Sequence, residues 1–192
     1  GTLRLKTATT TTISRTKAAF PPDTHIVKGT LEIEQGSGGT STRVRLGNHQ
    51  QLVIDGALRT ASGGAPSFAA GNFIQFERNG VAVGEGYSIH ARAGCSLDVF
   101  FCRFDDLYGS ANATEQTAAT VQSGFALSCG KAGIYRFQSC WFRNMADGGG
   151  VGAGIRYNRY LFLLGDTDDN GTPDQDFATT GSFIVFNKLR FE

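Results

Sequence analysis

Hydrophobic and polar residues alternate in short runs along this chain, and one stretch of such runs occurs twice in closely matching form. Residues 86–106 align with residues 124–144 without a gap, at a constant offset of 38 residues. The alignment places apolar on apolar residues: Tyr87 on Phe125, Ile89 on Leu127, Leu97 on Tyr135, Val99 on Phe137, Cys102 on Cys140 and Phe104 on Phe142. Such a match indicates an internal structural repeat.

The shared pattern is a pair of apolar residues one position apart, a two-residue interruption, and a second pair of the same kind. It occurs a third time near the end of the chain, at Ile184, Phe186, Leu189 and Phe191. Alternation with a period of two places the apolar side chains of a strand on one face. The interruption lets the chain change direction, so that both halves face the same interior. Each copy is therefore predicted to be a strand, a corner and a strand.

Such a unit cannot cover its own apolar face, so each copy must stack on the next one, as in a solenoid. Shorter alternating segments separated by glycine-rich turns predict further strands at residues 31–33, 44–46, 52–54, 74–76 and 160–164. Loops that protrude from the stack are expected at residues 108–123, 146–153 and 165–180.

These segments predict a single all-β domain over residues 26–192, preceded by an extended N-terminal arm over residues 1–25. The alternative fold is an antiparallel β-sandwich or jelly roll, which also consists of short alternating strands joined by glycine turns. The 26 glycines and 15 phenylalanines suit tight turns and pleated surfaces better than helices.

The second copy of the repeat carries a fuller phrase: Gly-Phe-Ala-Leu at 124–127, Tyr-Arg-Phe at 135–137 and Cys-Trp-Phe-Arg-Asn at 140–144. This phrase resembles the coils of right-handed parallel β-helix proteins, the pectate-lyase-like and phage-tailspike-like group. The likeness extends in style over residues 26–192 and is close at 86–144 and 181–192; the first copy carries Asp in place of the final Asn. It implies a short right-handed parallel β-helix with protruding loops.

The charge balance points to no particular partner. The chain has 18 Lys and Arg residues against 17 Asp and Glu residues, so no strong field favours nucleic acid or a membrane surface. No run of about 18 apolar residues is present, so no membrane partner is expected. The chain begins with Gly1 rather than Met, which is compatible with a removed leader or with an excerpt of a longer protein.

Four cysteines are too few for a disulfide scaffold in a chain of 192 residues, and none has the Cys-x-x-Cys spacing of a zinc site. In a stack, Cys102 and Cys140 are expected above one another on neighbouring strands, as free buried thiols. Cys95 and Cys129 do not align and are expected to be turn or wall residues.

An acidic segment near the C-terminus is the sharpest local motif. Oxygen ligands at alternate positions, followed by the turn residue Gly171, are what a hard cation such as calcium requires. The segment resembles calcium loops of the EF-hand, dockerin and thrombospondin type 3 kinds, although Phe177 stands where an EF-hand has its bidentate Glu. A structural calcium site is therefore one hypothesis, and a solvated acidic loop the other. The candidate ligands are Asp166, Asp168, Asn170, Asp174 and Asp176.

No catalytic motif stands out. The adjacent pair Asp105 and Asp106 is similar to the Asp-Asp of polygalacturonases, but the Gly-His-Gly and Arg-Ile-Lys companions of that family are absent. The pair is therefore interpreted as a turn after Phe104 and kept only as a weak catalytic candidate. Trp141 alternates out of phase with Cys140 and Phe142, so it is expected on the outer wall. With Tyr108 and Tyr157, it could contact a glycan or a neighbouring subunit.

The leading hypothesis from these features and the resemblance is a non-enzymatic structural or receptor-binding subunit of a virus particle. It would be a phage tailspike, fibre or capsid-decorating protein, assembled as a homotrimer with other virion proteins or a surface glycan as partners. One alternative is a secreted polysaccharide lyase or hydrolase, with acidic and basic residues along one wall (Asp98, Asp105, Asp106 and Arg103 or Arg143). The other is a bacterial surface adhesin module. All three imply a virion or extracellular location.

Overall fold

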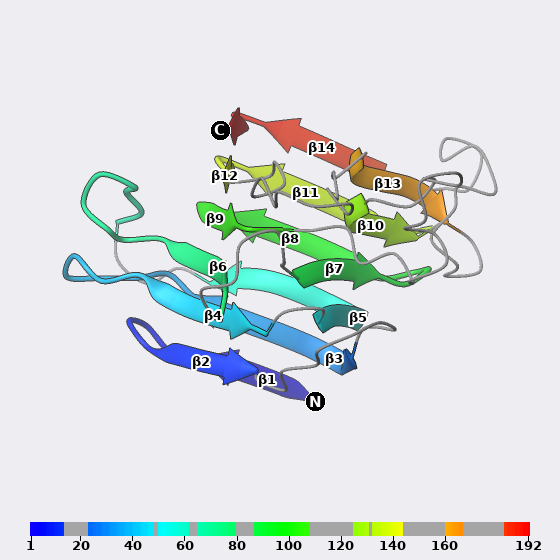
Figure 1. The fold of residues 1–192 in the computed structure, drawn as a ribbon, viewed down its shortest axis with the longest axis horizontal. Helices are drawn as coiled ribbons and strands as arrows, with labels where there is room; N and C mark the ends of the chain where they lie inside the picture. The colour runs from blue at the N-terminus through cyan, green and yellow to red at the C-terminus, as the bar shows by residue number, and fades with distance from the viewer. Residues whose placement is uncertain are drawn as a thin grey trace, which may run out of the picture.

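The computed structural model describes residues 1–13, 23–47, 50–61, 65–79, 87–107, 125–130, 132–143, 160–166 and 183–192. All regular secondary structure in these segments is β-strand, arranged in two sheets (Figure 1). None of the described segments forms a helix that is long and apolar enough to cross a membrane.

Sheet A has nine strands and sheet B has six. The strands of sheet A are β1 (Thr2–Leu5), β3 (Asp23–Glu34), β5 (Gln50–Ala61), β7 (Tyr87–Ala91), β8 (Ser96–Phe100), β10 (Phe125–Gly130), β11 (Ile134–Gln138), β13 (Tyr160–Asp166) and β14 (Phe183–Asn187). The strands of sheet B are β2 (Thr10–Ile13), β4 (Thr42–Leu46), β6 (Ile74–Arg78), β9 (Cys102–Asp105), β12 (Trp141–Arg143) and β15 (Arg190–Phe191).

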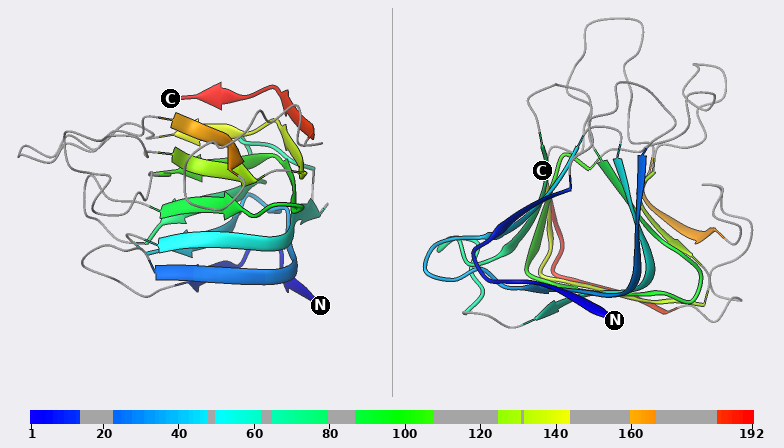
Figure 2. Two further views of the ribbon diagram at one scale, coloured as in Figure 1. Left: turned by 90° about the vertical axis from the view of Figure 1, so that its right-hand side faces the viewer. Right: turned by 90° about the horizontal axis from the view of Figure 1, so that it is seen from below.

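Every pairing between the described strands is parallel. This excludes the antiparallel sandwich for the described part of the chain. Sheet A divides at β5, whose first half pairs with β7 and whose second half pairs with β8. With sheet B as the third side, the strands enclose a three-sided interior when seen from below (Figure 2).

The chain follows the three sides in order, and each complete turn lies on top of the previous one. The strands of one turn form one layer. The successive layers are β1–β2, β3–β4, β5–β6, β7–β9, β10–β12 and β13–β15, from the N-terminal to the C-terminal end (Figure 1). The predicted strands at 31–33, 44–46, 52–54, 74–76 and 160–164 all lie within observed strands. The expected loops lie largely outside the described residues, although Gly165 and Asp166 belong to β13.

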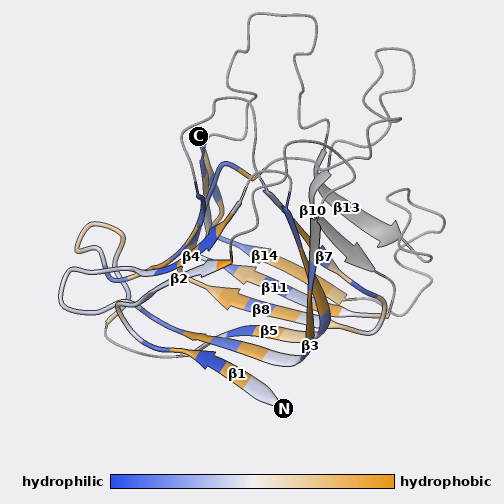
Figure 3. Ribbon diagram, turned by 60° about the horizontal axis from the view of Figure 1, so that its bottom comes forward, coloured by the Kyte–Doolittle hydropathy of each residue, from blue (hydrophilic) through white to orange (hydrophobic). Residues whose placement is uncertain are grey.

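The core consists of columns of inward side chains, one from each layer. The predicted alignment is confirmed strand by strand: Leu97 pairs with Tyr135 and Tyr135 with Ile184 in one column, which continues below to Leu58 and Leu31. In sheet B, the rings of Phe76, Phe104, Phe142 and Phe191 stack, with successive centroids 5.0, 5.0 and 5.4 Å apart. The banding along the strands in Figure 3 shows the same alternation of hydrophobic and hydrophilic residues.

The two-residue interruption is a corner, as predicted. Its second residue is Phe101, Ser139 or Lys188 in the three copies, and each has a left-handed backbone, with φ of 52°, 51° and 55°. A single left-handed residue turns the chain sharply from sheet A into sheet B. The repeat thus encodes a corner without using glycine there.

The N-terminal segment differs from the expected extended arm, because β1 and β2 are already strands of the two sheets. β1 pairs with β3, and β2 pairs with β4. β3 is also longer than the predicted 31–33 strand. It begins at Asp23, bends at Gly29, where φ is 94°, and continues to Glu34. Gly56 of β5 lies directly over Gly29, and a Cβ at Gly56 would overlap the Gly29 carbonyl. Glycine is needed there for this close backbone approach.

Candidate functional site

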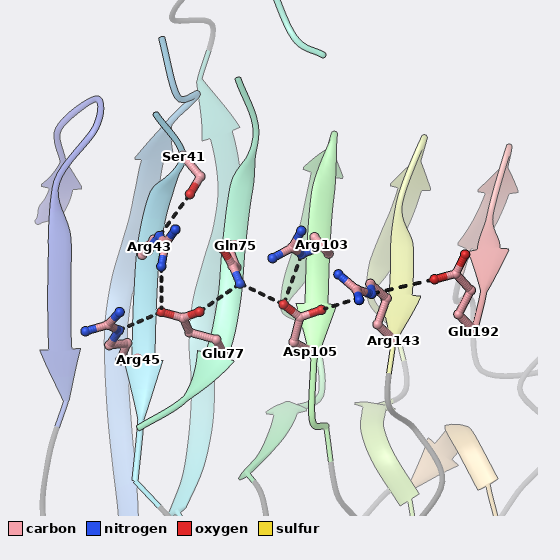
Figure 4. Close-up of polar contacts among 9 residues, drawn as sticks. All are labelled: Ser41, Arg43, Arg45, Gln75, Glu77, Arg103, Asp105, Arg143 and Glu192. Carbon is pink, nitrogen blue, oxygen red and sulfur yellow. Dashed lines mark hydrogen bonds and ion pairs between the residues drawn. The ribbon is translucent and has the colours of Figure 1, made fainter. Parts of the chain in front are cut away.

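The outward side chains of sheet B form two columns, because the residues before and after each inward residue point to the opposite face. The first column is Arg43, Gln75, Arg103, Trp141 and Arg190, and the second is Arg45, Glu77, Asp105, Arg143 and Glu192. Figure 4 shows the polar members of both columns side by side, except for Arg190. This outer face of sheet B is the candidate functional site.

Hydrogen bonds and ion pairs connect the layers across this face (Figure 4). In the lower half, Arg45 Nε lies 2.6 Å from Glu77 Oε1, and Arg43 Nη1 lies 3.6 Å from the same oxygen. Gln75 Nε2 then donates to both Glu77 Oε2 and Asp105 Oδ2, each at 2.7 Å. One amide group therefore joins two carboxylates that lie on neighbouring strands.

The upper half of the network centres on Asp105. Arg103 Nε donates to Asp105 Oδ2 at 2.9 Å, and Arg143 Nε lies 4.0 Å from Oδ1. Arg143 also pairs with Glu192 at 3.6 Å, and Glu192 pairs in turn with Arg190. The network thus runs from β4 to β15 through successive strands.

Asp105 is a buried carboxylate, with its side chain only 10% exposed. Burial raises its pKa above the ordinary value, while Arg103, the hydrogen bond from Gln75 and Arg143 act in the opposite direction. Asp106 follows with a left-handed backbone, φ 60°, and its N–H donates to the Arg143 carbonyl. The predicted turn is therefore at Asp106, whereas Asp105 still belongs to β9.

Trp141 lies on the outer wall, as predicted, between buried Cys140 and Phe142. Its ring is already in contact with the protein: the guanidinium carbons of Arg190, Arg143 and Arg103 lie 4.4, 5.0 and 5.9 Å from its centroid. Phe68 packs against it edge-on at 5.5 Å. The ring is thus partly buried within an arginine and aromatic cluster. Tyr108 and Tyr157, its suggested companions, lie outside the described residues.

The wall suggested for a hydrolase is only partly assembled. Arg103 and Arg143 do meet Asp105, but Asp98 lies on β8 of sheet A, where it pairs with Arg136 at 3.7 Å. Asp98 belongs to a different outer column, in which charges alternate between layers: Arg4, Glu32, Arg59, Asp98 and Arg136. The alternating charge of this column on the outside of sheet A is a feature that the sequence analysis missed. It could have been found from the residues beside each inward position.

The cysteine predictions are confirmed for the described residues. Cys102 and Cys140 occupy the same position in successive layers, and both are free and buried. Burial raises the pKa of Cys140 to about 12 and that of Cys102 well above its ordinary value, so neither is a thiolate nucleophile near neutral pH. Cys95 is likewise a buried thiol outside any disulfide among the described residues, and its sulfur lies 3.1 Å from the Gly56 nitrogen. The Cys129 side chain lies outside the described residues.

The calcium prediction also falls outside them. Asp166 ends β13, and its side chain is not among those described; Asp168, Asn170, Asp174 and Asp176 follow it in the segment that is left out. Among the described side chains, no group of three or more His, Cys, Asp or Glu residues could hold a metal ion. The calcium site therefore stays a prediction.

Comparisons with protein-family models, with curated proteins and with solved structures found no match to this chain. Function is therefore inferred from the residues and the geometry of this chain alone.

Proposed function

We propose that the chain is a short right-handed parallel β-helix and acts as a non-enzymatic structural subunit of a virus particle, such as a tailspike, fibre or capsid-decorating protein. The observation that carries this proposal is the continuous bonding of each layer to the next. Stacked rings link β6, β9, β12 and β15 on the inside. On the outside, ion pairs and the Gln75–Asp105 hydrogen bond link the layers from β4 to Glu192. In such a stack every bonded layer supports its neighbours, which suits a particle component exposed to mechanical and chemical stress.

The state of the candidate catalytic acids supports the same function. Asp105 is engaged by Arg103, Arg143 and Gln75, and Asp98 is engaged by Arg136. A carboxylate that already neutralises two arginines is poorly placed to exchange protons with a substrate. These acids instead hold neighbouring strands together.

The outer face of sheet B is the surface offered for receptor or glycan contact. It carries five arginines against three carboxylates, so it has an excess of positive charge. Arg190 is the most open of the arginines, with its side chain 62% exposed, and it lies beside Trp141. An acidic surface glycan would suit this face, since guanidinium groups bind carboxylate and sulfate groups well.

The subunit is proposed to assemble as a homotrimer, and the native mass in solution tests this. Light scattering with and without a calcium chelator should give a stable trimer in calcium. Dissociation on chelation would assign the segment from Asp166 to Asp176 to a structural calcium site, and a trimer that persists would argue against that site. A monomer under both conditions would contradict both the trimer and the calcium site.

A polysaccharide hydrolase or lyase is the second candidate, and one observation favours it. Glu77 and Asp105 are joined through Gln75, and the pKa of Asp105 is raised by burial, which is a property of a general acid. The test is turnover of a panel of acidic and neutral polysaccharides, with Asp105→Asn as the matched control. Turnover that is lost in Asp105→Asn would replace the non-enzymatic proposal, and inactivity across the panel would remove this candidate.

A further inference from the structure

Both ends of the described stack expose apolar side chains. At the C-terminal end, Phe186 of β14 is 44% exposed and Phe191 of β15 is 55% exposed. At the N-terminal end, Leu3 of β1 is 58% exposed. Among the described strands, β14 and β15 each end their sheet, and β1 pairs only with β3. Each end therefore presents an open parallel sheet edge beside exposed apolar surface.

Leu3 and the inward residues of the last layer are the terminal members of the interior columns. Ile184 lies over Tyr135, and Phe191 stacks on Phe142. At the other end, Leu3 lies beneath Leu31 in the column that Ile184 ends. The two ends of one column thus carry the same kind of side chain at the same position of the repeat.

We propose that copies of this chain associate end to end, with the β1–β2 layer of one copy pairing in parallel with the β14–β15 layer of the next. In this register Leu3 packs on Ile184, and Leu5 packs on Phe186. The contact continues the pairing that β1 already makes with β3, where Leu3 meets Leu31 and Leu5 meets Ile33. The β1 strand of the second copy would therefore give β14 a parallel strand partner and inward apolar contacts, as each strand within the stack gives its neighbour.

The outward residues are compatible with this register. Val185 ends the alternating column of sheet A above Arg136, and the next copy would place Arg4 over it. No like charges face each other across the junction, where the remaining pairs are Asn187 with Lys6, Arg190 with Thr10 and Glu192 with Thr12. β14, Phe-Ile-Val-Phe-Asn, also lacks the charged residues that usually protect an edge strand from pairing.

This contact goes beyond the proposed function and is separate from the proposed trimer. It joins different surfaces of the two copies, so it does not close on itself and produces a linear chain of copies. A trimer that does not grow with concentration would support the proposed function and contradict the end-to-end contact. Assemblies that grow with concentration but contain no trimer would support the end-to-end contact and contradict the proposed trimer.

Two variants test the contact, each altering one end. Phe191→Glu places a charge at the C-terminal end, and Leu3→Glu places one at the N-terminal end; both sites are more than half exposed, so the fold should persist. Sedimentation velocity over a range of concentrations should show growth for the unmodified chain and at least about a tenfold weakening for each variant, since an unpaired charge would be buried. An equimolar mixture of the two variants should form a complex limited to two assembly units, because each retains the opposite intact end.

Each other outcome overturns the proposal. Association of Leu3→Glu but not of Phe191→Glu would indicate a symmetric contact between two C-terminal ends. Unchanged association of both variants would place the contact elsewhere on the molecule. An unmodified chain that does not grow at any concentration would show that these edges do not bind a second copy, and would leave them to another protein or to a further segment of a longer polypeptide.

A matched pair at Val185 tests the register itself. Val185 points outward, so its substitution leaves the interior columns intact. Val185→Lys would place a cation between Arg136 and the next copy's Arg4, and association should weaken about tenfold. Val185→Glu would complete the alternating column, and association should strengthen. Equal effects of the two variants would contradict this register, and circular dichroism of each variant checks the fold.

Discussion

The inner and outer columns of sheet B come from the same strands but stabilise the stack by different interactions. The inner column consists of buried rings such as Phe104, whose contribution comes from apolar area removed from water and does not depend on which ring is the neighbour. The outer column contains groups such as Asp105, which are stable only opposite a particular partner. The comparison indicates that the interior supplies stability, while the exterior determines which layer lies beside which.

The outer faces of sheets A and B also differ in how deeply their charged side chains are buried. Asp105 on sheet B is 10% exposed in its side chain, whereas Asp98 on sheet A is 60% exposed. Both pair with arginines one layer away. Because water screens exposed pairs and not buried ones, the same arrangement should have very different energetic weight on the two faces.

Removing an inner ring should have the largest effect. Phe104→Ala deletes the ring between Phe76 and Phe142, and should reduce the free energy of unfolding by about 3–5 kcal/mol. Urea unfolding measures this loss, and Phe104→Leu, which keeps an apolar side chain, is the control and should lose less. Equal losses for the two variants would mean that the ring volume is unimportant.

Removing the buried outer carboxylate should come next. Asp105→Ala leaves Arg103, Arg143 and the Gln75 amide without their shared acceptor, and should cost about 3 kcal/mol. Asp105→Asn keeps an acceptor oxygen at the same place and should cost less than about 1.5 kcal/mol. Urea unfolding of both variants separates the hydrogen bonds from the charge, and an Asn variant as unstable as the Ala variant would show that the charge itself is required.

A smaller effect is expected from pH. Because burial raises the pKa of Asp105 above 3.8, the folded state binds this proton more tightly than the unfolded state. The contribution of Asp105 to stability is therefore fully present below the unfolded pKa and decreases as pH rises through the folded pKa. The unfolding free energy of the unmodified protein minus that of Asp105→Asn should fall from pH 4 to pH 7.

Glu34 provides the contrast in sign. The Thr7 N–H and Lys6 lower the pKa of this partly buried carboxylate, so its contribution is lost as pH falls. It is present in both proteins and cancels in the difference. A difference that rises with pH would show that the arginines outweigh burial at Asp105.

The smallest effect should come from the exposed pair on sheet A. Asp98→Ala removes the partner of Arg136 and should change the free energy of unfolding by less than about 1 kcal/mol, and less still at high salt. Urea unfolding at two salt concentrations measures both. A loss as large as that of Asp105→Ala would refute the idea that burial determines how much each ion pair contributes to the free energy of unfolding.

Much of the fold could be predicted because the repeat is local. The two-residue interruption before Cys102 and Cys140 predicted the corners, and the offset of 38 residues predicted the pairing of Leu97 with Tyr135. The pattern was weaker in the first layers. There, β3 and β5 each run along two sides of the stack as one long bent strand, whereas the later layers use two separate strands such as β7 and β8. β1 and β2 were therefore expected as an arm, although they pair in register with β3 and β4.

The candidate site was predicted only in part. The outward position of Trp141 followed from alternation, but the guanidinium groups around it come from Arg103, Arg143 and Arg190 on three strands. Asp105 was interpreted with Asp106 as a turn, because adjacent acids favour turns locally. Its burial and its partners on β6 and β12 depend on strands that are about 30 to 40 residues away in the sequence.

By itself, the sequence determined which side chains of each strand face inward, where the chain turns between strands, and that successive copies must stack. These properties depend on residues within a few positions of one another and on the period of a strand. Only the tertiary structure decided which charged side chains meet on the outside and how deeply each is buried. The physical reason is that those contacts lie across strands, so they exist only after the layers have stacked.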